Sequence, residues 1–375
     1  MRALYQVKLA NDQNIKRVWK PSVFLESMES NVNHTLKFGT PKNNRGRLGL
    51  VPSSRPLPGS QAYRQLVSEA VNQVTDQERL TSVMDFAMQG AWTKWDQVES
   101  LDFTWNNLLY GLTPKLLSFA LNATQLTLPT PDRLRVWGKT TVGACKLCSL
   151  PNATLYHILC NCSFSLLRGR YGWRHDSVLR TIHTFVKDRI AEQNKRKPQL
   201  QPVLTAFVRA GAKVSSQPHK QPSTVLSCAN DWQFLFDFKD NPVIFPPTIF
   251  ATSDRPDIVI WSEAAKTVII LELTVPGEDA IADAAFRKTN KYNPLVAGCT
   301  LQGWKVHFRT IEISCRGFVA FSFRTCFRFL GFSNPVIKLV SSRVSKTALR
   351  CSYALYLARD NSSWQPLQLL CDPNQ

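Results

Sequence analysis

Hydrophobic residues recur at intervals of three and four along residues 76–142, as in "VMDFAMQGAWTKWDQVESLDFTWNNLLYGL". This period places them on one face of a helix. Pro114 and Pro129 interrupt the pattern and mark the ends of helical segments. We therefore predict a helical region over residues 76–142.

Two further helical patterns follow. Residues 164–194 begin with a basic and aromatic turn and continue as an amphipathic helix, for which Asp176 is a candidate N-cap. Residues 332–375 predict a C-terminal helix and tail, with Asn334 at the cap and Pro335 in the first turn. The apolar stripe of this last helix contains Val336, Val340, Val344 and Ala348.

Two short apolar runs predict strands. "DIVIW" starts at Asp257, "VIILELTV" starts at Val268, and the polar turn "SEAAKT" joins them. The second run is apolar at successive positions, as in a central strand that is buried on both faces. A helix is expected from Glu278 to about Val296, with acidic residues in its first turn.

Polar segments separate these elements. Residues 1–75 are basic and rich in Pro, Asn and Ser, which predicts an arm without fixed structure. Residues 195–224 are rich in Pro, Gln, Ser and Lys, which predicts a linker at a domain boundary.

The charge of the chain points to a polyanionic partner. Among 375 residues, 46 Lys and Arg face 27 Asp and Glu, which gives a formal net charge of +19. Such an excess is typical of proteins that bind nucleic acid, although a solvated basic surface would give the same composition. No targeting peptide and no apolar run of membrane-spanning length is found, so we expect an intracellular protein without a membrane partner.

Four of the ten cysteines lie in the short stretch "CKLCSLPNATLYHILCNC". Cys145 and Cys148 have the C-x2-C spacing that lets two thiolates converge on one tetrahedral ion. His157 and Cys162 supply the second half of a zinc knuckle, and Cys160 is the alternative fourth ligand. With all four positions filled by protein, the zinc is expected to be structural.

A second constellation lies in the predicted strands. Glu272 falls in the middle of the buried strand, where an unpaired carboxylate costs several kcal/mol, so it must be paired, protonated or bound to a cation. Asp257 lies beside it across the hairpin, and two such carboxylates suit a hard divalent cation. The alternative is a structural ion pair of Glu272 with Arg255 or Lys288.

The helix that follows adds cationic groups. Lys288, Lys291 and Tyr292 stand at i, i+3 and i+4 and so share one helix face. One of the two lysines is expected to reach a metal-bound water or a scissile phosphate.

The motif R-P-D-(x14)-E-L-T-V-P followed by R-K-x2-K-Y resembles the restriction-like endonuclease of R2-like site-specific non-LTR retrotransposons, a variant of the PD-(D/E)xK nucleases. The knuckle and the succeeding G-R-Y-x-W-R-H-D resemble the zinc-binding region between reverse transcriptase and endonuclease in the same polyproteins. The resemblance covers roughly residues 76–357. It implies an α/β (α+β) fold with a small mixed sheet flanked by helices.

The resemblance also implies roles for residues. Asp257 and Glu272 would bind catalytic Mg2+, with Mn2+ as a substitute. Lys288 or Lys291 would supply the catalytic cation, with Tyr292 nearby.

The sequence departs from the family pattern in several places. Thr274 stands where ordinary PD-(D/E)xK enzymes carry their lysine, and Gly277 stands where a bulky aromatic is expected. His175 and Asp176 match an R-H-D of the family, for which helix capping is a sufficient role. No polymerase signature is found in the chain.

We therefore expect a nuclear, DNA-binding, zinc-containing protein with a Mg2+-dependent endonuclease domain. DNA, element RNA and a reverse transcriptase polypeptide are the expected partners. The arginines expected to contact phosphates are Arg168, Arg170, Arg174 and Arg180. The alternatives are an inactive DNA- or RNA-binding remnant and a protein–protein adaptor.

The expected organisation has seven parts. These are a basic arm (1–75), a helical region (76–142), the zinc knuckle (143–163), an amphipathic helix (164–194), a linker (195–224), the restriction-like endonuclease (225–331) and a C-terminal helix with tail (332–375).

Overall fold

The structure, a computed structural model, describes residues 61–86, 90, 92, 95–99, 108, 110–196 and 224–365. The chain divides into two compact units, residues 1–94 and 95–375.

The described part of the first unit is mainly helix α3, Gln61–Met84. The predicted arm of residues 1–75 is wrong over residues 61–75, which belong to this helix. The helix contains no Gly or Pro and is rich in Gln, Ala, Leu, Glu and Arg, so nothing in it interrupts backbone hydrogen bonding. Residues 1–60 of the arm lie outside the described residues.

The second unit contains a four-stranded mixed sheet with the order β1-β2-β3-β4. Strands β1 to β3 pair antiparallel, and β4 runs parallel to β3. The strands are β1 (Gln233–Phe236), β2 (Ile258–Ser262), β3 (Thr267–Thr274) and β4 (Lys305–Glu312). A mixed fold of helices around a small mixed sheet is thus confirmed.

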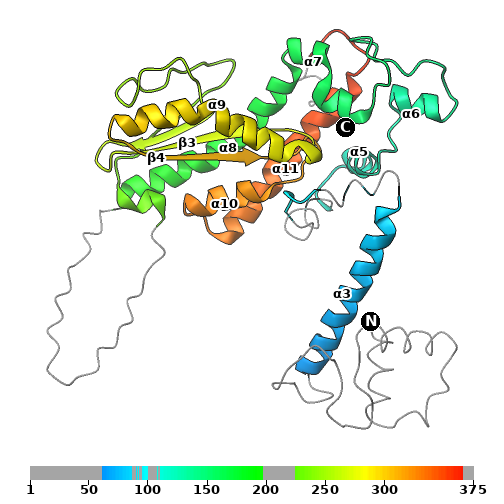
Figure 1. Ribbon diagram of the computed structural model, residues 1–375, viewed down its shortest axis with the longest axis horizontal. Coiled ribbons are helices and arrows are strands. Elements are labelled where there is room, and N and C mark those ends of the chain that lie inside the picture. The colour runs from blue at the N-terminus through cyan, green and yellow to red at the C-terminus, as the bar shows by residue number, and fades with distance from the viewer. Residues whose placement is uncertain are drawn as a thin grey trace. The chain divides into compact units, whose positions relative to one another are not determined.

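The helical elements of this unit surround the sheet and extend beyond it (Figure 1). They are α5 (Pro114–Thr124), α6 (Pro131–Val136), η3 (His157–Asn161), α7 (Ser163–Leu167), α8 (Arg170–Lys195), η4 (Val225–Cys228), η5 (Glu278–Ala280), α9 (Ile281–Leu301), α10 (Phe321–Phe329) and α11 (Asn334–Leu357).

Strands β2 and β3 form the predicted hairpin. Ile258 pairs with Leu271, so the next positions outward are Asp257 and Glu272. Every residue of β2 is buried, as are all residues of β3 except Thr274. The run of apolar β-branched residues in both strands suits a sheet that is covered on both faces.

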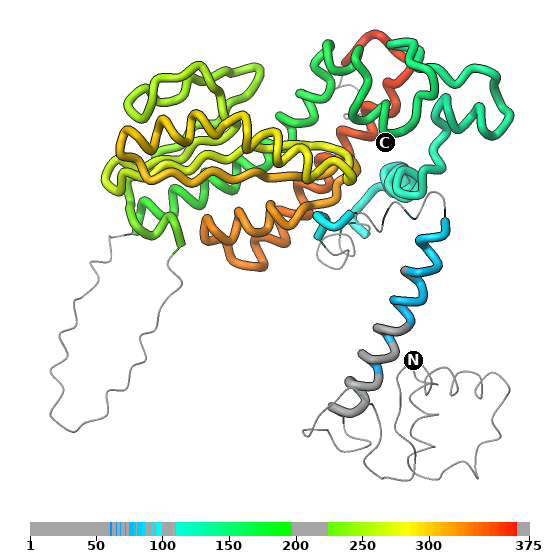
Figure 2. The backbone as a smooth tube through the Cα atoms, in the orientation of Figure 1, coloured from blue at the N-terminus to red at the C-terminus, as the bar shows by residue number. Residues whose placement is uncertain are grey.

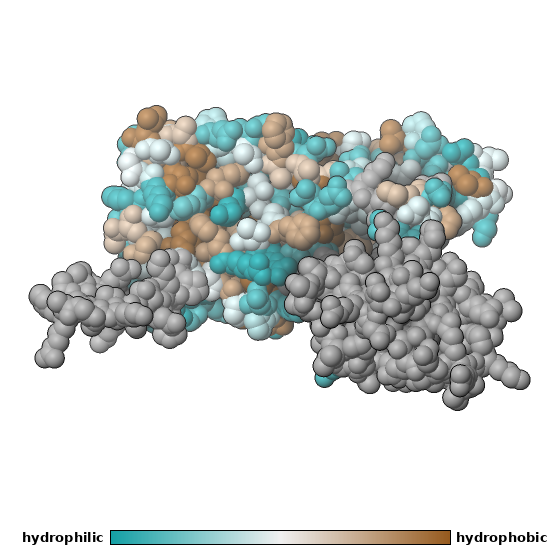
Figure 3. All heavy atoms as spheres, turned by 60° about the horizontal axis from the view of Figure 1, so that its bottom comes forward, coloured by the Kyte–Doolittle hydropathy of each residue, from teal (hydrophilic) through white to brown (hydrophobic). Residues whose placement is uncertain are grey.

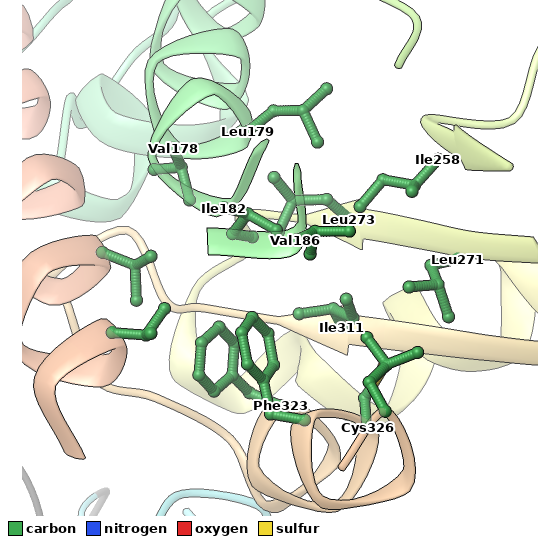
Figure 4. Close-up of a cluster of buried hydrophobic side chains, with 14 of the residues drawn as sticks. Val178, Leu179, Ile182, Val186, Ile258, Leu271, Leu273, Ile311, Phe323 and Cys326 are labelled. Atoms are coloured by element: carbon green, nitrogen blue, oxygen red, sulfur yellow. The ribbon is translucent and has the colours of Figure 1, made fainter. Parts of the chain in front are cut away.

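One face of the sheet packs against α8, α10 and α11. Figure 4 shows Ile182 and Val186 of α8 beside Leu273, with Ile311 of β4 and Phe323 of α10 completing the cluster. All five side chains are 1% exposed or less. This hydrophobic core fixes α8 against the sheet.

The opposite face packs against α9. Tyr292, Leu295 and Cys299 of this helix contact Val268 and Ile270 of β3 in a second buried cluster. The sheet therefore forms the middle of three layers, with α9 on one side and α8, α10 and α11 on the other.

The segment that carries the knuckle packs against the C-terminal helix. Leu116 and Phe119 of α5 and Ile158 of η3 share a buried cluster with Leu355 and Tyr356 of α11. Figure 2 follows the tube from this segment to the C-terminal helix that lies beside it. Parts of the chain far apart in sequence thus form one compact unit.

Three predictions require correction. Helix α8 is part of the same core as the sheet, so the boundary expected at 195–224 does not separate it from the strands; residues 197–223 lie outside the described residues. Asp176 is not an N-cap, because α8 already begins at Arg170 after Gly169, whose φ of 69° favours glycine. The residue at the cap of α11 is Ser333, with Asn334 as the first helical residue.

Candidate functional site

The four predicted zinc ligands converge on one point. One ligand atom from each of Cys145, Cys148, His157 and Cys162 lies within 4.8 Å of all the others. The Sγ atoms of Cys145 and Cys162 are 4.0 Å apart, and Cys148 Sγ lies 3.4 Å from His157 Nε2. In a tetrahedral zinc site with Zn–S bonds of about 2.3 Å, two sulfur ligands lie about 3.8 Å apart. The donor set and its spacing therefore fit zinc.

Cys162 is the fourth member of this cluster, and Cys160 is not. Cys160 interacts with Cys315 and packs into the core shared with α5 and α11. Cys160 lies within the short π-helical turn His157–Asn161, and Cys162 follows it. Cys160 faces the core shared with α5 and α11, and Cys162 faces the other ligands.

The protonation of the cluster suits a divalent cation. Burial raises the pKa of the Cys145 thiol to about 11. Burial alone would raise the pKa of the Cys162 thiol, but hydrogen bonds with Ser165, Cys148 and Cys145 together outweigh it and lower that pKa. Burial lowers the pKa of His157, so its imidazole is neutral and able to ligate metal at neutral pH. A bound cation supplies the charge that lets both buried thiols ionise.

Tyr171 of α8 connects the knuckle to the sheet layer. Its hydroxyl accepts a hydrogen bond from Cys162 N at 2.9 Å and lies 3.0 Å from the Ile158 carbonyl, to which it donates. The helix that packs on the sheet thus also holds the backbone of a zinc ligand.

Asp257 and Glu272 lie together at the end of the β2–β3 hairpin. Glu272 Oε2 accepts a hydrogen bond from Asp257 N at 3.1 Å, and Asp257 Oδ2 accepts one from Leu273 N at 2.8 Å. Glu272 is 1% exposed and Asp257 is 9% exposed. Burial, followed by the charge of Asp257, raises the pKa of Glu272, and Lys288 opposes both effects.

Of the two helix lysines, Lys288 reaches the carboxylates. Its Nζ donates to Glu272 Oε1. Lys291 Nζ instead donates to Tyr292 Oη at 2.9 Å, and Tyr292 Oη donates to the Arg255 carbonyl at 3.1 Å. Tyr292 therefore anchors the segment that leads into Asp257.

Arg255 does not pair with Glu272. Its guanidinium binds Asp237, with Nη2 at 2.6 Å from Oδ1. Thr274, two positions after Glu272, has a buried Oγ1 without a hydrogen-bond partner among the described residues. The cation that pairs with Glu272 of strand β3 is therefore Lys288 of helix α9.

His175 joins this site from α8. Its Nε2 lies 3.2 Å from Asp257 Oδ2 and 3.2 Å from the Leu273 carbonyl oxygen, and its Nδ1 lies 3.0 Å from Asp176 Oδ1. Burial by itself lowers the pKa of His175, but the charge of Asp257 and hydrogen bonds to Asp176 and Asp257 outweigh it and raise the pKa to about 10. From the sequence, helix capping was a sufficient role for His175 and Asp176. The R-H-D motif at residues 174–176 is the sequence feature that could have indicated their position near Asp257.

Gly277 lies close to the knuckle. A Cβ at this position would collide with the ring of Tyr156, which precedes the ligand His157. The ring of Tyr156 therefore occupies the space that a side chain at position 277 would need.

The four arginines expected to contact phosphates divide into two pairs. Arg170 and Arg174 are 1% and 2% exposed, which contradicts a role in phosphate binding. Arg170 donates to the Ala358 carbonyl, and Arg174 donates to Ser352 Oγ and the Val275 carbonyl. Arg168 and Arg180 are exposed, and Arg180 forms a surface ion pair with Asp240.

A comparison with known families supports the zinc region. The family model described as "zinc-binding in reverse transcriptase" matches residues 86–167, which include all four ligands. This match and the geometry of the cluster identify a structural zinc region of the type associated with reverse transcriptases and retrotransposons. No curated protein matches the chain. Among the described residues, no helix is long and apolar enough to span a membrane.

Proposed function

We propose that the chain is a nucleic-acid-binding C-terminal part of an R2-like non-LTR retrotransposon protein, and that it carries a Mg2+-dependent DNA endonuclease of the PD-(D/E)xK type. The observation that carries this proposal is the convergence of Asp257, Glu272 and Lys288 from a loop, a strand and a helix. A zinc region associated with reverse transcriptases precedes this site in the chain.

The donor set fits magnesium. Hard divalent cations prefer oxygen ligands. The site offers the two carboxylates and the Leu273 carbonyl oxygen, which lies near Asp257 because both contact His175 Nε2. Asp257 and Glu272 would hold the ion, and Mn2+ would be accepted by the same oxygens. When bound, Mg2+ lowers the pKa of a water molecule and neutralises charge on a phosphodiester.

The chain's own residues orient and stabilise the reacting groups. Lys288 holds Glu272 in place and presents an ammonium group that stabilises the negative charge developing on the scissile phosphate. Tyr292 fixes the backbone before Asp257, and Lys291 on the same helix supports Tyr292 and adds positive charge beside the site. The cut strand would supply a 3′-hydroxyl for priming of reverse transcription.

Positive charge would provide the affinity for DNA or for element RNA. The net charge of +19 and the exposed Arg168 and Arg180 support this. On the coloured part of the face in Figure 3, hydrophilic and hydrophobic residues lie in small interspersed patches. A nuclear location and a reverse transcriptase polypeptide as partner belong to the same proposal.

A second candidate is an inactive nucleic-acid-binding remnant. It is favoured by one observation: both carboxylates already have cationic partners within the protein, Lys288 on Glu272 and His175 on Asp257. A buried network of this kind also occurs as a purely structural feature.

Cleavage of supercoiled plasmid distinguishes the two candidates. The purified chain is incubated with plasmid in Mg2+ or in EDTA, together with the Asp257→Ala and Lys288→Ala variants. We expect nicking that requires Mg2+ and is abolished by Asp257→Ala. Salt-dependent plasmid binding without cleavage under any condition would establish the remnant, and no binding at physiological salt would favour an adaptor.

A further inference from the structure

His175 lies between two carboxylates and a carbonyl oxygen. Nδ1 faces Asp176 Oδ1, and Nε2 faces Asp257 Oδ2 and the Leu273 carbonyl oxygen. The imidazole ring is therefore held between two aspartates.

Asp176 holds the His175 ring on its Nδ1 side. Asp176 is 5% exposed, and its Oδ2 accepts a hydrogen bond from Lys239 N at 3.1 Å while its Oδ1 binds His175. The His175 side chain retains 21% exposure. It is thus held on its Asp176 side, while part of the side chain is accessible to solvent.

The oxygens that Nε2 contacts also suit a divalent cation. Asp257 Oδ2 and the Leu273 carbonyl oxygen both lie 3.2 Å from this one atom, and they are hard oxygen ligands next to Glu272. A divalent cation bound to both oxygens would lie closer to them than Nε2 does, so the imidazole ring and the cation would overlap in space.

We propose that His175 is a positioning residue that competes with the divalent cation for Asp257 and the Leu273 carbonyl, so that cation binding requires the imidazole ring to leave these two oxygens. This inference rests on the proposed nuclease function. Because Tyr171 on the same helix hydrogen-bonds the knuckle backbone, His175 links cation binding to the helix that contacts the zinc region.

Mn2+ binding to the full chain tests the competition. The signal of free Mn2+ in electron paramagnetic resonance is followed for the wild type and for Asp257→Ala, His175→Ala and His175→Gln. We expect one Mn2+ site that Asp257→Ala abolishes and that His175→Ala tightens at least tenfold. His175→Gln, which keeps a neutral donor, should bind with intermediate affinity. Equal or weaker binding by His175→Ala would overturn the inference and leave the proposed nuclease intact.

A wild-type chain without an Asp257-dependent Mn2+ site would instead refute the proposed function and the inference with it. If His175→Ala does not fold, 15N-histidine spectra of the wild type give a second answer. Addition of Mg2+ should shift the His175 Nε2 resonance in the wild type and leave it unchanged in Asp257→Ala. An unchanged resonance in a wild type that binds Mn2+ would contradict the competition.

Discussion

Lys288 of helix α9 donates a hydrogen bond to Glu272 of strand β3, a carboxylate that is 1% exposed. The lysine and the glutamate are sixteen residues apart in the chain. The pair places an ammonium group from a helix beside a carboxylate in the middle of the sheet.

The first prediction concerns this pair. Lys288→Met should reduce the free energy of unfolding by about 1–3 kcal/mol, because it leaves a buried carboxylate without its cation. Lys291→Met is the matched control: Lys291 is exposed and, among the described residues, contacts the Tyr292 hydroxyl and ring, so the change should stay within about 0.5 kcal/mol. Urea denaturation of both variants measures the difference. Equal effects would show that Glu272 does not depend on Lys288.

The second prediction concerns the zinc ligands. Native mass spectrometry should find one zinc per chain in the wild type and in Cys160→Ser, and none in Cys162→Ser. The reason is that Cys162 belongs to the ligand cluster and Cys160 does not. Removal of zinc by a chelator should unfold the knuckle, since structural zinc contributes on the order of 10 kcal/mol to such sites. Loss of zinc from Cys160→Ser with retention in Cys162→Ser would reverse the assignment.

The third prediction concerns the buried pair of Arg316 and Glu278. Arg316 Nε lies 2.9 Å from Glu278 Oε2, and Nη1 donates to the Ala123 carbonyl of α5. Both residues are buried, so Arg316→Ala should cost about 3–5 kcal/mol of stability. The exposed pair of Arg180 and Asp240 is the control, and Arg180→Ala should cost at most about 1 kcal/mol. Thermal unfolding of both variants checks this, and a small loss in Arg316→Ala would contradict it.

The fourth prediction separates surface arginines from buried ones. Arg168→Ala should weaken binding to a DNA duplex and reduce the salt dependence of the affinity, because an exposed guanidinium can neutralise a phosphate. Arg170→Ala should instead lower the melting temperature, because it removes hydrogen bonds to the Ala358 and Asn361 carbonyls. Fluorescence anisotropy at several salt concentrations measures the affinities. A folded Arg170→Ala variant with a reduced salt slope would place Arg170 at the interface after all.

The fifth prediction concerns pH and Glu312. Burial raises the pKa of this carboxyl, while a hydrogen bond from Ser322 opposes the shift. Because the folded pKa lies above the unfolded one, the folded state binds more protons between the two values, and stability falls as pH rises through that window. Glu312→Gln removes this titration, so its stability relative to the wild type should increase from pH 4 to pH 8. Melting temperatures across this range that run parallel for the two proteins would exclude the effect.

Local pattern was sufficient for several features. The spacing of Cys145, Cys148, His157 and Cys162 identified the zinc ligands, because a knuckle is a short-range structure whose ligands lie close in sequence. The apolar runs after Asp257 and Val268 likewise predicted the β2–β3 hairpin, since a two-stranded hairpin depends on its own residues and its turn.

Tertiary structure decided the rest. In the sequence, Arg170 and Arg174 look no different from Arg168 and Arg180, since all four are arginines in one basic stretch. The packing of α8 against α11 buries Arg170 and Arg174 and leaves the other two exposed. His175 reaches Asp257 across 82 positions of the sequence, a contact that no local pattern encodes. The sequence by itself therefore determined which groups are present and which local elements carry them. The packing of α8, β3 and α9 decided which of those groups meet, because long-range contacts depend on the whole hydrophobic core.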